Sequence, residues 1–182
     1  SPLFELPMPF TPFHFGIALP FIFWDWKHKR IDALTALVAS VIIDFRSAIL
    51  FLFLNERDMA VLHGPFHTFL AATILGLFTG LFFHWTESFW NRFRSWFKWS
   101  QTTSLNTKLM VGVVMTYSHI FLDAAIYSEM APLSPFVEGN FLLNWLSSSF
   151  VYTICVLGYL SGIVLYIGYV IWNLANNPSD ES

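Results

Sequence analysis

The chain has 182 residues, of which 55% are hydrophobic and only 12% are charged, and its mean hydropathy is +0.57. Soluble domains usually carry about 25% charged residues, so this composition argues against a soluble domain and favours an integral membrane protein. The net charge is −3 and there is no basic tract, so we expect no nucleic-acid partner. Cys155 is the only cysteine, which excludes an internal disulfide and a cysteine-rich metal site.

Five apolar segments predict the membrane-spanning helices: residues 15–26, 33–54, 66–85, 108–127 and 150–172. All but the first reach the roughly 20 residues that cross a bilayer as a helix. The first segment is shorter and contains Pro20, and we expect it to span the membrane fully or nearly so. The sequence therefore predicts an all-α, polytopic transmembrane bundle of four or five spans. We expect residues 1–182 to form one integral membrane domain in contact with the lipid bilayer.

Residues 87–100 (ESFWNRFRSWFKWS) mix aromatic residues with arginine and lysine. This composition is typical of an amphipathic helix that lies in the membrane interface. We predict such an interfacial helix between the third and fourth long apolar segments.

Basic residues indicate the orientation of the bundle. An alternating path through the spans places seven of them on one side: Lys27, Lys29, Arg30, Arg92, Arg94, Lys98 and Lys108. Only Arg57 lies in an opposite loop, and Arg46 lies within a span. Because cytoplasmic loops carry an excess of lysine and arginine, we expect a multi-pass protein whose basic loops are cytoplasmic. Its C-terminus is then cytoplasmic, and the loops around His63 and residues 129–144 face outward.

Glycines at spacing i, i+4 indicate close helix contacts. Gly76 and Gly80 form one such pair, and Gly158 and Gly162 form another. Small residues at this spacing allow membrane helices to approach closely. The pairs can serve contacts inside the bundle or contacts with other membrane subunits.

Six polar residues lie in or beside the apolar segments and are the candidate site: His14, Asp44, His63, His67, His119 and Asp123. A charged side chain at the bilayer centre costs at least about 2.5–3.5 kcal/mol, so these residues need partners. His119 and Asp123 share a helix face at spacing i, i+4. On the topology above, all six converge in the outer half of the bundle.

Imidazoles and carboxylates without a thiolate are a ligand set for zinc, manganese or iron. A catalytic metal keeps one position open for water and lowers the pKa of that water to about 7, which makes hydrolysis the expected chemistry. We predict a divalent metal, zinc or manganese, with Asp44 as a ligand or as the catalytic base. The substrate would be a lipid or another molecule reached from the outer leaflet.

Other interpretations of these residues stay open. His14 can be an interfacial histidine, His63 and His67 can lie in a hydrated loop, and His119 can form a hydrogen-bond pair with Asp123. Ser118 adjoins His119, but nothing around it resembles a nucleophile elbow, so catalysis by serine is the weaker alternative.

Four short motifs, in chain order, resemble those of the membrane-bound metal-dependent hydrolase family. They are Phe10-Thr11-Pro12-Phe13-His14-Phe15-Gly16, Ile42-Ile43-Asp44, His63-Gly64-Pro65-Phe66-His67-Thr68 and Ser118-His119-Ile120-Phe121-Leu122-Asp123. Pro132-Leu133-Ser134-Pro135 resembles a proline-rich stretch that follows them. The resemblance implies a compact helical bundle in a prokaryotic inner membrane, with a divalent metal site.

The chain departs from the family's pattern in two places. Arg46 stands where the family usually has a second acid, and Tyr127 and Ser128 stand where members often carry a polar ligand. Arg46 either points away from the site, weakens the binding of the metal, or takes the place of the metal as the cation of the site. Two hypotheses follow: a metal-dependent hydrolase, or a non-catalytic relative that serves as an accessory subunit of a larger membrane complex.

Overall fold

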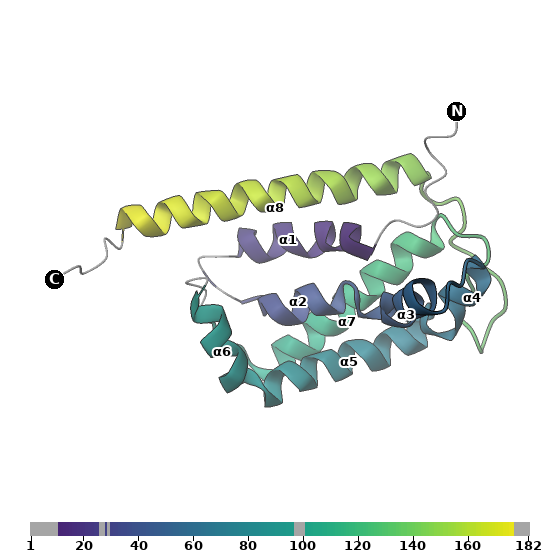
Figure 1. Cartoon of the computed structure of the whole chain (residues 1–182), viewed down its shortest axis with the longest axis horizontal. Coiled ribbons are helices and arrows are strands. Elements are labelled where there is room, and N and C mark those ends of the chain that lie inside the picture. Colours follow the sequence, from purple (N-terminus) through teal and green to yellow (C-terminus); the bar gives the residue numbers. More distant parts are fainter. Residues whose placement is uncertain (1–10, 26–27, 29, 97–100, 177–182) are drawn as a thin grey trace.

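The computed structural model describes residues 11–25, 28, 30–96 and 101–176. This part of the chain contains eight α-helices, three short 3-10 helices and no strand, which confirms the all-α prediction (Figure 1). The elements in chain order are η1 (Thr11–His14), α1 (Phe15–Trp24), α2 (Ala33–Ala39), η2 (Ile42–Asp44), α3 (Phe45–Phe53), α4 (Met59–His63), η3 (Gly64–Phe66), α5 (Phe69–Trp85), α6 (Glu87–Trp96), α7 (Leu105–Ala124) and α8 (Ser148–Asn176).

Helices α5 and α7 pack closely along their length (Figure 1). A Cβ atom built on Gly76 would lie 2.8 Å from the backbone of Gly112. One built on Gly80 would lie 2.8 Å from the backbone of Lys108. The hydroxyl of Thr116 donates a 2.8 Å hydrogen bond to the carbonyl of Ala72 across the same contact. Small residues therefore set the distance between these two helices.

Helices α1 and α8 form the second close pair (Figure 1). A Cβ atom on Gly158 would overlap the carbonyl of Gly16, and one on Gly162 would lie 2.5 Å from Cβ of Leu19. The four glycines noted in the sequence thus lie at helix contacts within this chain.

The segment predicted as one span over 33–54 is broken. Helix α2 ends at Ala39, and α3 begins only at Phe45, after the 3-10 turn η2, with a bend of 43° between the two parts. The hydroxyl of Ser40 donates to the carbonyl of Leu37 and closes the last turn of α2. The break leaves the carbonyl of Ser40 outside the helical pattern, where it accepts a hydrogen bond from His119.

Helix α8 is the clearest membrane span, because its 29 residues are long and apolar enough to cross a bilayer. Two bent pairs of helices reach the same length and composition: α2 with η2–α3, and α4–η3 with α5, the second pair bent by 61°. Helix α1 has only ten residues, about 15 Å of helix. By length and composition the described residues thus supply one span, or up to three, so the predicted four or five spans are not confirmed.

Helix α6 occupies Glu87–Trp96 of the segment predicted as interfacial, and residues 97–100 of that segment lie outside the described residues. It alternates aromatic and basic side chains as expected, and Phe89 and Trp96 are exposed. The predicted cytoplasmic C-terminus depends on residues 177–182, which also lie outside the described residues. The same holds for residue 26 of the first expected span and for three of the seven basic residues, Lys27, Lys29 and Lys98.

Candidate metal centre

Five of the six predicted site residues come together in the bundle. One ligand atom each from Asp44, His67, His119 and Asp123 lie within 4.8 Å of one another. The ring of His14 stacks on that of His119 with 3.8 Å between centroids, and its Nε2 lies 3.4 Å from Oδ1 of Asp123. These five residues are called the His/Asp cluster below.

Each member reaches the cluster from a helix end or from α7. His14 ends η1 and precedes α1, Asp44 ends η2, and His67 directly follows η3. His119 and Asp123 project from one face of α7, as their i, i+4 spacing predicts. The break after α2 and the bend before α5 are therefore what bring Asp44 and His67 to the face of α7.

The His/Asp cluster is buried, with each of its five residues at most 2% exposed. Two carboxyl groups lie in this buried site, and an isolated ionised carboxylate is costly to bury. The cluster therefore needs positive charge, either as protons on the imidazoles or as a bound cation.

Backbone carbonyls fix the orientation of two imidazoles. Nδ1 of His119 lies 2.8 Å from the carbonyl oxygen of Ser40, and Nδ1 of His67 lies 2.5 Å from that of His63. Because a carbonyl oxygen only accepts hydrogen bonds, both Nδ1 atoms carry the proton. Both Nε2 atoms then face the centre of the cluster.

The Nε2 atoms meet carboxylate oxygens at short distances. Nε2 of His67 lies 3.2 Å from Oδ1 of Asp44, and Nε2 of His119 lies 3.1 Å from Oδ2 of Asp123. With Nδ1 protonated, a neutral imidazole presents a lone pair at Nε2, so each pair sets two acceptors against each other. A second proton on the ring or a shared metal ion would relieve this repulsion.

Several buried polar atoms of the cluster form no hydrogen bond within the described part of the chain: His14 Nδ1, His14 Nε2, His119 Nε2 and Asp123 Oδ1. Buried polar atoms are nearly always hydrogen-bonded. The stacked rings of His14 and His119 also disfavour a positive charge on both, because like charges at close contact repel. These observations fit a divalent cation better than a fully protonated set of histidines.

His63 lies beside the cluster and outside the group of four ligand atoms. Its Nδ1 bonds to Oε1 of Glu129 at 2.9 Å, and its ring contacts Tyr127 and His67. Its carbonyl orients His67, as described above. The bend between α4 and α5 turns the two histidines in different directions, which their spacing alone does not reveal.

Arg46 points away from the cluster. Its Nη1 donates to the carbonyls of Val61 and Leu62 at 2.7 and 3.4 Å, at the end of α4. Gly64 permits this position, because a Cβ there would lie 2.5 Å from Nη1. Ser118 is also turned away, since its hydroxyl donates to the carbonyl of Val114 on its own helix.

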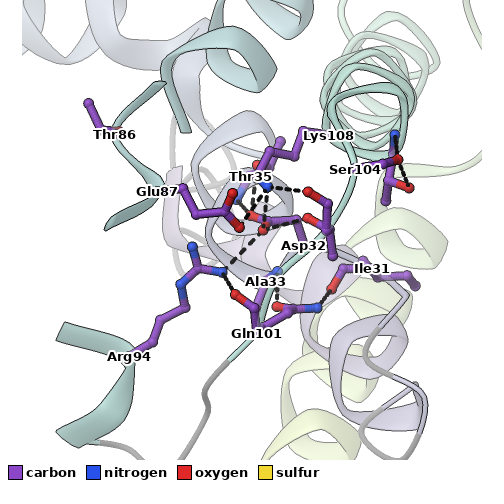
Figure 2. Close-up of polar contacts among 12 residues, drawn as sticks. Ile31, Asp32, Ala33, Thr35, Thr86, Glu87, Arg94, Gln101, Ser104 and Lys108 are labelled. Carbon is purple, nitrogen blue, oxygen red and sulfur yellow. Dashed lines mark hydrogen bonds and ion pairs between the residues drawn. The ribbon is translucent and has the colours of Figure 1, made fainter. Parts of the chain in front are cut away.

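A second buried polar group surrounds Asp32 (Figure 2). Its Oδ2 lies 3.2 Å from Nη1 of Arg94 and 3.8 Å from Nζ of Lys108, and it accepts a hydrogen bond from Thr103 at 3.0 Å. Nζ of Lys108 lies 3.2 Å from Oε1 of Glu87. Lys108 and His119 are both on α7, about 16 Å apart along its axis, so this Asp32 network lies far from the His/Asp cluster.

Burial alone would raise the pKa of Asp32, but hydrogen bonds from the backbone and side chain of Thr35, with Arg94 and Lys108 close by, hold that pKa below its usual value. The network was missed because Arg94 and Lys108 were interpreted only as part of the positive charge on one side of the membrane. A signal was present in the sequence: Asp32 directly precedes an apolar helix, the usual place of an N-cap, and its Oδ1 accepts from the backbone N–H of Thr35.

No protein-family model, curated protein or solved structure matches the chain. The family resemblance noted in the motifs is therefore a hypothesis that the functional proposal carries forward.

Proposed function

We propose that the chain is a multi-pass protein of a prokaryotic inner membrane that holds one divalent metal ion in the His/Asp cluster and uses it for hydrolysis. The observation that carries this proposal is the orientation of His67 and His119. Both donate Nδ1–H to a backbone carbonyl and turn Nε2 toward a carboxylate. Metal-binding histidines almost always donate their other N–H in this way.

Each residue of the cluster would have a role in metal binding or in proton transfer. Four residues would hold the ion: His67, His119, Asp44 and Asp123. His14, whose Nε2 lies beside Oδ1 of Asp123, would be a further ligand of the ion. The ion would supply Lewis acidity and lower the pKa of a bound water. Asp44 reaches both His67 and His119 through one oxygen, so its second oxygen is the candidate base that takes a proton from the attacking water. His63 would orient His67 and connect it to Glu129.

The membrane arrangement is part of the proposal. Helix α8, the two bent pairs and α7 would cross the bilayer, with α1 packed beside α8. The cluster would then lie in the outer half and the Asp32 network at the cytoplasmic end. The excess of basic residues in the segments around Asp32 and α6 supports this orientation.

Metal content tests the proposal. We expect protein purified in mild detergent to carry about one zinc or manganese ion per chain, counted by inductively coupled plasma mass spectrometry. His119→Ala should lower the affinity by more than about 100-fold, because it removes a ligand as well as its orientation. His28→Ala, at an exposed histidine outside the cluster, is the matched control and should bind metal like the parent protein. Metal-free protein that stays unloaded after incubation with zinc and manganese would sink the proposal.

The burial of the cluster favours one alternative, a non-catalytic accessory subunit whose metal ion is structural. Structural metal sites are closed, whereas catalytic sites keep a position open, and all five cluster residues are buried. The exposed apolar side chains of α8, such as Leu157 and Val164, would face lipid or a partner subunit. Turnover of 4-methylumbelliferyl esters or phosphodiesters that is lost in His119→Ala would support hydrolysis. Stoichiometric metal without turnover, together with co-purifying subunits, would support the alternative.

A further inference from the structure

An apolar groove of about 420 Å³ lies among helices α1, α2, α6 and α8. Side chains from all four helices line it, including Ile22, Leu37, Phe93 and Ile163. Arg94 is the one charged residue among its lining residues. This volume is in the range of pockets that hold small apolar ligands.

Two nitrogen atoms of the Arg94 guanidinium have no hydrogen-bond acceptor among the described residues. The residue is only 3% exposed, and its Nη1 is occupied by Oδ2 of Asp32 and the carbonyl of Gln101. Its Nε and Nη2 atoms are also buried and form no hydrogen bond within the described residues. Buried donors without an acceptor are costly, so a ligand at this position should bring oxygen acceptors.

The stretches of sequence that lead into α2 and that contain α6 carry excess positive charge, and three of their basic residues, Lys27, Lys29 and Lys98, lie outside the described residues. Residues 25–32 and 87–108 contain seven lysines and arginines against three acids, in a chain whose net charge is −3. Basic residues next to membrane helices attract anionic lipids. The expected ligand is therefore both apolar along its length and negatively charged at one end.

We propose that the groove binds one acyl chain of an anionic phospholipid, whose phosphate oxygens accept hydrogen bonds from Nε and Nη2 of Arg94. Two parallel N–H groups of a guanidinium match two oxygens of a phosphate. Asp32 and the carbonyl of Gln101 bind the third nitrogen, Nη1. These bonds fix the orientation of the guanidinium and leave Nε and Nη2 for the lipid phosphate. The site is independent of the metal chemistry, because it lies at the Lys108 end of α7, away from His119.

Native mass spectrometry of the whole chain, titrated with phosphatidylglycerol or with phosphatidylcholine of the same acyl chains, tests this site. We expect phosphatidylglycerol to bind more tightly. Arg94→Gln should weaken its binding about tenfold or more, because a charge-assisted hydrogen-bond pair is lost. Ile163→Trp should weaken binding of both lipids by filling the groove from α8.

Matched controls separate the site from general effects. Arg92→Gln removes an exposed charge on the same helix, and Ile171→Trp places the same bulk at an exposed position of α8 that does not line the groove. Both should bind phosphatidylglycerol like the parent protein. Equal binding of the two lipids, or parental binding by either Arg94→Gln or Ile163→Trp, would overturn the proposal. If Arg94→Gln fails to fold, Ile163→Trp decides alone, since it leaves the Asp32 network intact.

Discussion

At the scale of single residues, the chemistry depends on which ring nitrogen of each histidine faces the carboxylates. His67 lies in the turn between η3 and α5 and His119 lies on α7, yet both bond through Nδ1 to a carbonyl that a helix end or break leaves free. The same breaks that disturb the helices thus supply the acceptors that orient the ligands. A regular helix through residues 33–54 would have used the carbonyl of Ser40 internally, and His119 would have lost its partner.

Arg46 gives a residue-scale prediction. Arg46→Asp should leave the metal content unchanged, because the guanidinium binds the carbonyls of Val61 and Leu62 and not the cluster. The loss of these bonds should lower the free energy of unfolding by about 1 kcal/mol. Thermal unfolding and metal analysis check both parts, with Arg92→Gln as the control. A clear gain of metal affinity would show that Arg46 acts on the site.

At the scale of helices, close backbone contacts hold α5 against α7 and so hold His119 and Asp123 near His67. Gly76→Ala should lower the free energy of unfolding by about 1–3 kcal/mol, because the new methyl group meets the backbone of Gly112, which cannot move aside easily. Gly168→Ala is the control, since a Cβ there meets nothing within 4 Å. A similar effect of both substitutions on thermal unfolding would contradict this packing.

The network around the start of α2 predicts a dependence on pH. Because the pKa of Asp32 in the folded protein lies below its usual value of 3.8, its ionised form stabilises the fold above that value. This contribution is lost as the pH falls through the lowered pKa.

Unfolding temperatures measured between pH 7 and pH 3 should therefore fall at the acid end. Asp32→Asn should already be less stable at pH 7, since Arg94 and Lys108 lose their shared carboxylate, and should depend less on pH. Glu138→Gln, at an exposed position, should keep the parental pH dependence. An unchanged profile in Asp32→Asn would remove Asp32 as the cause.

At the scale of the whole molecule, apolar length predicted where the helices lie, and the i, i+4 rule placed His119 beside Asp123. The convergence of His14, Asp44 and His67 on the same face of α7 followed from the expected topology of the spans. The break after Ala39 was not predictable from hydropathy, because Val41, Ile42 and Ile43 continue the apolar run through it. The bend before Phe69 lies in the mixed stretch 63–68, whose composition does not give the direction of the bend. Beside this bend, His63 bonds to Glu129 and lies outside the group of four ligand atoms, so its role as a metal ligand stays a prediction.

The Asp32 network escaped notice for a different physical reason. It forms only when α6 folds back so that Arg94 reaches Asp32, 62 residues earlier in the chain. No local pattern marks such a contact. Its two acids, Asp32 and Glu87, offset the charges of Arg94 and Lys108, and a count of loop charges alone does not reveal these contacts.

X-ray absorption spectroscopy of zinc- or manganese-loaded protein is the most direct test of the metal centre. We predict a first shell of nitrogen and oxygen only, with the outer-shell scattering of at least two imidazoles, which is lost in His119→Ala. Sulfur in the first shell, or a spectrum of hydrated metal without imidazole scattering, would contradict a metal held by the His/Asp cluster.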